Sequence, residues 1–166
     1  MAKVTFKMSE KEIVDKLKRN VGSKYVWKTL VPRAGRVFVG IDKKKLKDAI
    51  RFLKTDGFTH LSAITGLETE GEIELLYHLS KEDVLLTIRV RLPLNEAVIP
   101  SITDHILGAT LYEQEIHDLL GVNFEGHPNL APLILPDDWP NGVYPLRKSQ
   151  TAEKGKAERE HSRSSV

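Results

Sequence analysis

The segment from residue 111 to residue 128, LYEQEIHDLLGVNFEGHP, holds the side chains of this chain best suited to acid–base or metal chemistry. It carries the carboxylates of Glu113, Glu115 and Asp118 and the imidazoles of His117 and His127. Imidazoles and carboxylates are common zinc ligands and common general acids and bases. One hypothesis for function is therefore an independent metal-dependent or acid–base enzyme that uses Glu113, His117 and His127.

A helix predicted over residues 107–120 would separate most of these groups. Glu113 and His117 are four residues apart and share one flank of such a helix, whereas Glu113 and Glu115 do not face each other. Two ligands are too few for a zinc site. His127 lies in a Gly-His-Pro turn, where an imidazole is expected to anchor the loop by hydrogen bonding. The apolar stripe of the helix is predicted to contain Ala109, Tyr112, Ile116, Leu119 and Leu120.

The alternative is recognition of another protein. Charged groups flank an apolar stripe, and residues 94–148 are predicted to form a connector, the helix and an extended docking arm. Prolines at positions 128, 132, 136, 140 and 145 exclude a long helix or a central strand there. Because such an apolar segment has little capacity to bury itself, a partner is expected to order it. Residues 149–166 are polar and of low complexity, and we predict that they are disordered.

Residues 1–93 must supply the scaffold, and their pattern predicts an α+β domain with the order α-β-β-α-β-β-β. Ser9 and Glu12 form a capping-box sequence at the start of the first helix. A hairpin turn is expected near residues 32–35, and Asp42 is expected to cap the second helix. In the last strand, alternating apolar and polar residues predict a sheet with helices on one face and water on the other.

Composition narrows the classes of function. The chain has no cysteine, which excludes disulfides, thiolate metal sites and cysteine nucleophiles. It has no apolar run of the roughly 20 residues that span a bilayer, and its first residues lack a signal core, so a cytosolic, unprocessed chain is expected. Residues 1–56 contain 16 of the 25 Lys and Arg and 6 of the 23 Asp and Glu, a net charge of +10. Their lysines surround an amphipathic helix without interleaved aromatic residues, so no nucleic-acid partner is expected.

The stretch YEQEIHDLLGVNFEGHPNLAPLILPDDW, with the later YPLRKS, resembles the signature region of the family of the thirty-kilodalton subunit of respiratory complex I, an NADH dehydrogenase. That family also supplies a subunit to membrane-bound, energy-converting nickel–iron hydrogenases. The chain departs from the family pattern where Gln114 replaces an arginine and where Ala131 and Pro132 replace basic residues. The matching positions are Glu113, Glu115, Asp118, Gly121, Phe124, Gly126, His127, Pro128, Leu130, Leu133, Leu135, Pro136, Asp138, Trp139, Pro145, Leu146, Arg147 and Lys148.

The resemblance implies a non-catalytic structural subunit in the hydrophilic arm of a membrane-bound, ion-pumping redox complex. The parent complex would be a complex I-like NADH/quinone oxidoreductase or a group 4 nickel–iron hydrogenase. This chain would carry no cofactor. Iron–sulfur clusters, and nickel–iron or flavin groups, would belong to partner subunits. The implied partners are a large catalytic-type subunit and a small iron–sulfur subunit, with the membrane arm contacted indirectly, on the cytoplasmic side of the cell membrane. The expected interface residues are Glu113, Glu115, Asp118, Gly126, His127, Pro128, Trp139, Leu146, Arg147 and Lys148.

Overall fold

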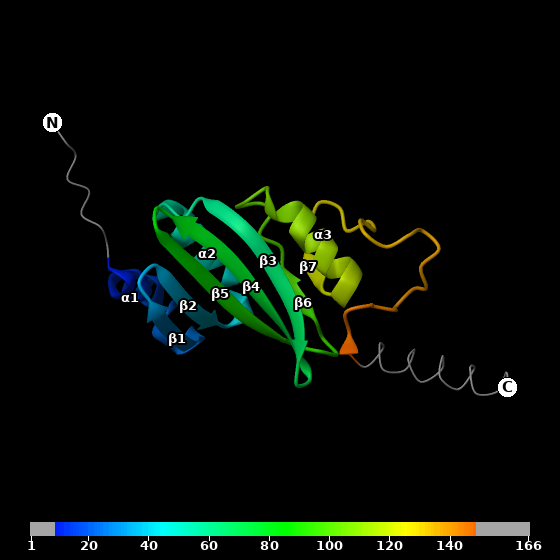
Figure 1. Ribbon diagram of the computed structural model, residues 1–166, viewed down its shortest axis with the longest axis horizontal. Coiled ribbons are helices and arrows are strands. Elements are labelled where there is room, and N and C mark those ends of the chain that lie inside the picture. The colour runs from blue at the N-terminus through cyan, green and yellow to red at the C-terminus, as the bar shows by residue number, and fades with distance from the viewer. Residues whose placement is uncertain (1–8, 149–166) are drawn as a thin grey trace.

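A five-stranded mixed sheet forms the centre of the structure, a computed structural model in which residues 9–148 are described (Figure 1). Its strands lie in the order β1-β2-β5-β4-β3. Neighbouring strands are antiparallel except β2 and β5, which are parallel. The strands are β1 (Val26–Arg33), β2 (Arg36–Ile41), β3 (His60–Thr69), β4 (Glu72–Lys81) and β5 (Val84–Pro93).

Helices α1 (Glu10–Val21) and α2 (Leu46–Thr55) cover one face of this sheet, as the sequence predicted. The predicted capping box is present, since the Ser9 hydroxyl accepts from the Glu12 N–H and the Glu12 carboxylate accepts from the Ser9 N–H. Asp42 caps a short 3-10 turn, η2 (Lys43–Lys45), that leads into α2. A second 3-10 turn, η1 (Ser23–Tyr25), joins α1 to β1.

The alternation in β5 confirms the prediction that its apolar side chains face the helices, although Thr87, which was predicted on the wet face, is buried as well. Leu86, Ile88 and Val90 are fully buried under the helices. Arg89 and Arg91 point to the other face, where both approach the carboxylate of Glu74 on β4. The order α-β-β-α-β-β-β is therefore confirmed for the α+β layer.

After β5 the chain forms a small element that the sequence did not predict. Strand β6 (Val98–Pro100) pairs in parallel with β7 (Asn123–Glu125), and helix α3 (Ala109–Leu120) lies between them in the chain. Three-residue strands are too short to show an alternating pattern, which explains why residues 94–106 read only as a connector. The helix begins two residues later than the predicted start at residue 107.

Helix α3 extends the helical layer past the edge of α2 and packs on β3 (Figure 1). Close packing is possible because Gly66 on β3 has no side chain. A Cβ atom built there would lie 2.6 Å from Leu120 Cδ1. The hydroxyl of Tyr112 also donates to the carbonyl of Ser62 at 3.0 Å. The sheet therefore fixes the position of α3 and of every side chain that α3 presents.

Candidate docking site on helix α3 and the C-terminal arm

Glu113 lies inside this chain rather than on its surface. Glu113 is 0% exposed, although helical periodicity predicted that it lies on one flank of the helix. Its carboxylate accepts from the Ser101 hydroxyl at 2.6 Å and from the Ile102 N–H at 2.9 Å. Burial raises the pKa of Glu113, and these two donors together with nearby His127 oppose that shift. Glu113 therefore ties α3 to the connector after β6.

Asp118 ties the helix to the arm. One carboxylate oxygen, Oδ2, accepts from the backbone N–H groups of Leu133, Ile134 and Leu135 at 2.8, 2.8 and 3.2 Å. Burial alone would raise the pKa of Asp118, but these three donors and the neighbouring His117 lower it below the usual carboxyl value. Three successive N–H groups aimed at one oxygen form a concave anion site. Asp118 supplies that anion from within the chain.

The two histidines bind backbone groups at different places. His117 Nδ1 donates to the Val122 carbonyl at 2.8 Å. His127 Nδ1 accepts from the Asn129 N–H, so its Nε2 carries the proton and donates to the Thr110 carbonyl at 3.1 Å. His127 therefore anchors its loop by hydrogen bonds, as the sequence predicted.

Glu113, His117 and His127 do not form one reactive centre. No hydrogen bond or ion pair joins any two of them within residues 9–148. The same described region contains no cluster of three or more His, Cys, Asp or Glu side chains with metal-binding geometry. An open hollow of about 190 Å³ between α3 and the arm does include His117 and Asp118. Both groups already hold the backbone contacts described above.

Arg147 fastens the end of the arm to the end of α3. Its Nε donates to the Leu120 carbonyl at 2.8 Å, and its Nη atoms approach the carbonyls of Leu94 and Gly121 at 3.4 and 3.5 Å. Its guanidinium carbon also lies 4.7 Å from the centre of the Tyr144 ring. A cation is favourable here because the last carbonyls of a helix are unpaired and carry partial negative charge.

We predict that Arg147→Ala lowers the free energy of unfolding by about 1–3 kcal/mol, because three part-buried carbonyls lose a charged donor. Urea unfolding monitored by circular dichroism measures the change. Lys148→Ala is the matched control, since among residues 9–148 Lys148 bonds through its backbone N–H, to the Glu68 carboxylate, rather than through its side chain. The control should change stability by less than about 0.5 kcal/mol. Equal losses in the two variants would contradict the anchoring role of Arg147.

The remaining predicted residues lie along the same surface. Glu115 is exposed, as are Gly126, Pro128 and Leu146. Trp139 is half-buried and donates its Nε1 proton to the Val143 carbonyl. Helix α3, the β7 turn and the arm carry all ten residues, and the side chains of five of them, Glu113, Asp118, His127, Trp139 and Arg147, bond to other groups of this chain.

Apolar side chains on this surface were missing from the predicted site. Leu107 is 79% exposed and Leu111 is 61% exposed. Leu111, Gln114 and Asp118 follow one another at spacings of three and four residues, so they lie along one side of α3, and Leu107 lies in the turn just before the helix. The arm contacts that side at Asp118 and at Gln114, which donates to the Ala131 carbonyl at 3.2 Å. Leu133 and Ile134, which Asp118 holds, are exposed as well. We call Leu107, Leu111, Leu133 and Ile134 the leucine stripe.

Two buried residues near Glu113 were also missed. Ser101 is almost fully buried and bonds Glu113 from a proline-bounded connector that gave no sequence signal. The phenol of Tyr77 on β4 is fully buried, and its oxygen has no hydrogen-bond partner among the described residues. Burial, and secondarily the charge of Glu113, raise the pKa of Tyr77 well above its ordinary value.

The raised pKa of Glu113 predicts a pH-dependent contribution to stability. The folded state binds the Glu113 proton more tightly than the unfolded state, so this contribution is full below pH 4.5, the ordinary value for the group, and declines as pH rises through the folded-state pKa. The stability advantage of the wild type over Glu113→Gln should therefore be larger at about pH 4 than at neutral pH. Urea unfolding across this range tests it. Glu115→Gln, an exposed control, should show no such trend, and a gap that widens with pH would contradict the prediction.

Comparison with known proteins identifies relatives over most of the chain. The family model described as "Respiratory-chain NADH dehydrogenase, 30 Kd subunit" matches residues 39–156. A subunit of the F(420)H(2) dehydrogenase of Methanosarcina mazei is 37% identical over 118 residues, which cover 68% of this chain and 74% of the relative. The membrane-bound hydrogenase subunit beta of Pyrococcus furiosus is 34% identical over 158 residues, which cover 89% and 88%.

A solved structure agrees with these matches. A chain of the membrane-bound sulfane sulfur reductase, described as an archaeal respiratory membrane complex, superposes with a TM-score of 0.75 at 30% identity. The superposition covers 89% of this chain and 91% of that one. No helix in the described part of this chain, residues 9–148, is long and apolar enough to cross a membrane.

Proposed function

Because the chain belongs to the family of the 30-kilodalton subunit of respiratory-chain NADH dehydrogenase, we propose that it is a non-catalytic structural subunit in the hydrophilic arm of a membrane-bound, ion-pumping redox complex. Its homologues are subunits of complex I-like and hydrogenase-type membrane complexes. The parent complex would be of the NADH/quinone oxidoreductase type or the group 4 nickel–iron hydrogenase type.

The observation that carries this proposal is that the arm is bonded to α3 of the same chain while apolar side chains of both remain exposed. The sequence led us to expect a partner to order residues 94–148, but in the structure backbone groups of the arm bond to α3 of the same chain. The apolar side chains of the leucine stripe remain outside. Exposed large apolar side chains with polar residues beside them are typical of a protein–protein interface. Polar groups of the chain thus hold the arm against α3, and the exposed apolar side chains remain available to a neighbouring subunit.

The proposed neighbours are a large catalytic-type subunit and a small iron–sulfur subunit. The cofactors of electron transfer would belong to these neighbours, and this chain would join the complex peripherally on the cytoplasmic side of the membrane. In this assignment Glu115, Gly126, Pro128, Trp139, Leu146 and Lys148 contribute to the interface directly. Glu113, Asp118, His127 and Arg147 act through the position of α3 and of the arm.

Affinity purification from the native organism tests the assignment. A tag on this chain should recover, from detergent-solubilised membranes, one complex that contains a large catalytic-type subunit and an iron–sulfur subunit. Mass spectrometry identifies the subunits, and visible absorption identifies the iron–sulfur clusters. Recovery of this chain alone, as a monomer outside the membrane fraction, would overturn the proposal.

A further inference from the structure

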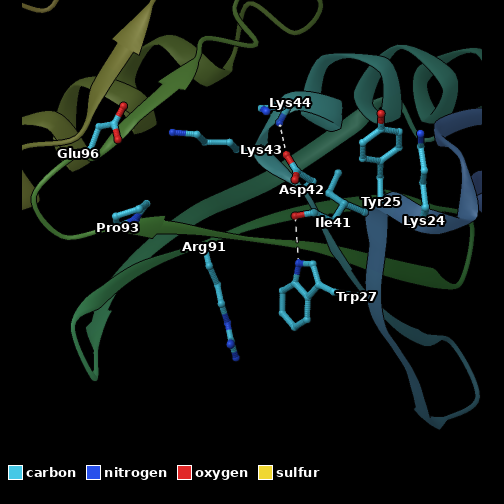
Figure 2. Close-up of a pocket in the computed structure, with 10 residues that line it drawn as sticks. All are labelled: Lys24, Tyr25, Trp27, Ile41, Asp42, Lys43, Lys44, Arg91, Pro93 and Glu96. Atoms are coloured by element: carbon cyan, nitrogen blue, oxygen red, sulfur yellow. Dashed lines mark hydrogen bonds between the residues drawn. The ribbon is translucent and has the colours of Figure 1, made fainter.

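A hollow of about 580 Å³ opens where β2 and β5 end, next to the start of β1 (Figure 2). Strand β1 is the edge opposite β3, so this hollow lies at the other end of the sheet order from α3. Two aromatic residues, Tyr25 and Trp27, form part of its wall. We call it the lysine pocket, after its cationic lining residues: Lys24, Lys43, Lys44 and Arg91.

The lysines of the pocket have no anionic partner in the part of the chain that the structure describes. Among residues 9–148, the hydrogen bond of the Lys43 ammonium group goes to a neutral carbonyl, that of Val98, at 3.4 Å. That of Lys24 lies 4.9 Å from the centre of the Tyr25 ring. No ion pair is formed by Lys44 within residues 9–148. Figure 2 shows the Lys43 side chain extending across the opening toward Glu96.

Neighbouring lysines outside the pocket are paired. Lys45 binds Asp48 at 2.8 Å, and Lys47 binds Asp104 at 2.6 Å. The four lysines between residues 43 and 47 therefore fall into two groups, those that line the hollow and those that do not. Lys43 and Lys44, which line the hollow, form no ion pair among residues 9–148, although Asp42 and Glu96 also line it, whereas Lys45 and Lys47 beyond it are paired. Positive charges gathered around a concave surface raise the local concentration of anions there.

The aromatic wall of the pocket is held in place by the sheet. Trp27 Nε1 donates to the Ile41 carbonyl at 3.1 Å. The indole ring lies against Gly40, where a Cβ atom would come within 2.5 Å of it. The Arg91 guanidinium lies 4.6 Å from the centre of the same ring and also approaches Glu74. This side of the pocket is therefore rigid and apolar, and its arginine charge is partly neutralised.

We propose that the lysine pocket binds the carboxylate side chains of an acidic segment of a neighbouring subunit, an inference that rests on the proposed function. Charge complementarity favours an anionic occupant, and two features favour carboxylates of a protein over a phosphate group. Asp42 accepts from the Lys44 N–H at 2.9 Å, so this N–H at the start of η2 is not available to a phosphate group. The rings of Tyr25 and Trp27 would pack on the aliphatic parts of an extended chain.

Lysine reactivity in the purified complex tests this inference. Acetylation of Lys24, Lys43 and Lys44 should be about tenfold slower in the complex than in the isolated chain, because buried ion pairs shield the amines. Lys11, Lys18 and Lys28, which have no ion pair among residues 9–148, serve as reference amines. Carbodiimide, which joins an amine to a contacting carboxylate without a spacer, should link the pocket lysines to Asp or Glu of a neighbour.

A matched pair of variants completes the test. The triple variant Lys24→Gln, Lys43→Gln, Lys44→Gln should bind the complex about tenfold more weakly at low salt, since three charge pairs are lost. The triple variant Lys11→Gln, Lys18→Gln, Lys28→Gln removes the same charge elsewhere and should change affinity less than about twofold.

The outcomes separate the two proposals. If no partner is recovered with the chain, the proposed function fails and this inference fails with it. If the complex is recovered but the pocket lysines react as in the isolated chain, only this inference is overturned. Protection that yields no cross-link and disappears on dialysis would identify a small anion, which also overturns the assignment to a protein segment.

Discussion

Replacement of Leu111 by aspartate is expected to leave the isolated chain folded and to remove it from the complex. Leu111 is 61% exposed, so the substitution disturbs little inside the chain. At an interface, a carboxylate in place of an apolar contact is desolvated without a partner, which costs about 3 kcal/mol or more. The affinity for the complex should therefore fall about a hundredfold or more. Affinity purification measures the loss, and thermal unfolding of the isolated chain checks the fold.

Leu30→Asp is the matched control for this experiment. Leu30 is 47% exposed on β1, at the sheet edge opposite the one that α3 covers. It should retain the subunits that wild type retains. Normal recovery of Leu111→Asp would show that the leucine stripe is not covered by a partner and would contradict the docking site.

Asp118→Ala is expected to release the arm from α3. Three backbone N–H groups lose a charged acceptor at one time. At about 1 kcal/mol or more for each bond, the open form of the arm should become roughly a hundredfold more populated. Chymotrypsin cleaves after leucine and aromatic residues unless proline follows, so it should then cut after Leu133, which Ile134 follows, far faster than in the wild type. Asp137→Ala, an exposed position in the same arm, should be cleaved at the wild-type rate.

The wild-type arm should also open in acid. The lowered pKa of Asp118 means that its contribution is full above pH 3.8, the ordinary value for the group, and is lost as pH falls through the folded-state pKa. An acid-stable protease should therefore cut the wild-type arm increasingly below that pH, whereas Asp118→Ala should already be open. Resistance of the alanine variant at neutral pH would contradict the role assigned to Asp118.

Local patterns predicted the scaffold because their causes are local. The Ser9–Glu12 box, the cap at Asp42 and the alternation in β5 each arise from residues a few positions apart. The turn around His127 was predicted for the same reason. The family resemblance likewise depended on fixed spacings within a short part of the chain. It located the docking region, but it did not say which side chains face outward.

The rest of the site depends on contacts between distant residues. Glu113 is buried where Ser101 and Ile102, on a connector twelve and eleven positions upstream, donate to it. Asp118 finds its donors fifteen to seventeen positions downstream. The lysine pocket combines residues of β1, β2 and β5. Helical periodicity gives the direction of a side chain but not the presence of such partners, so it placed Glu113 on a solvated flank.

The attachment of the arm at Asp118 and again at Arg147 bears on how fast and how tightly the subunit assembles. A segment that folds only on contact must lose chain entropy during association, which weakens binding. Here that entropy has already been lost when the chain folds alone, so association is expected to resemble the docking of two rigid bodies. Release of the arm by Asp118→Ala should then restore the entropic penalty and weaken assembly even though every interface side chain is unchanged.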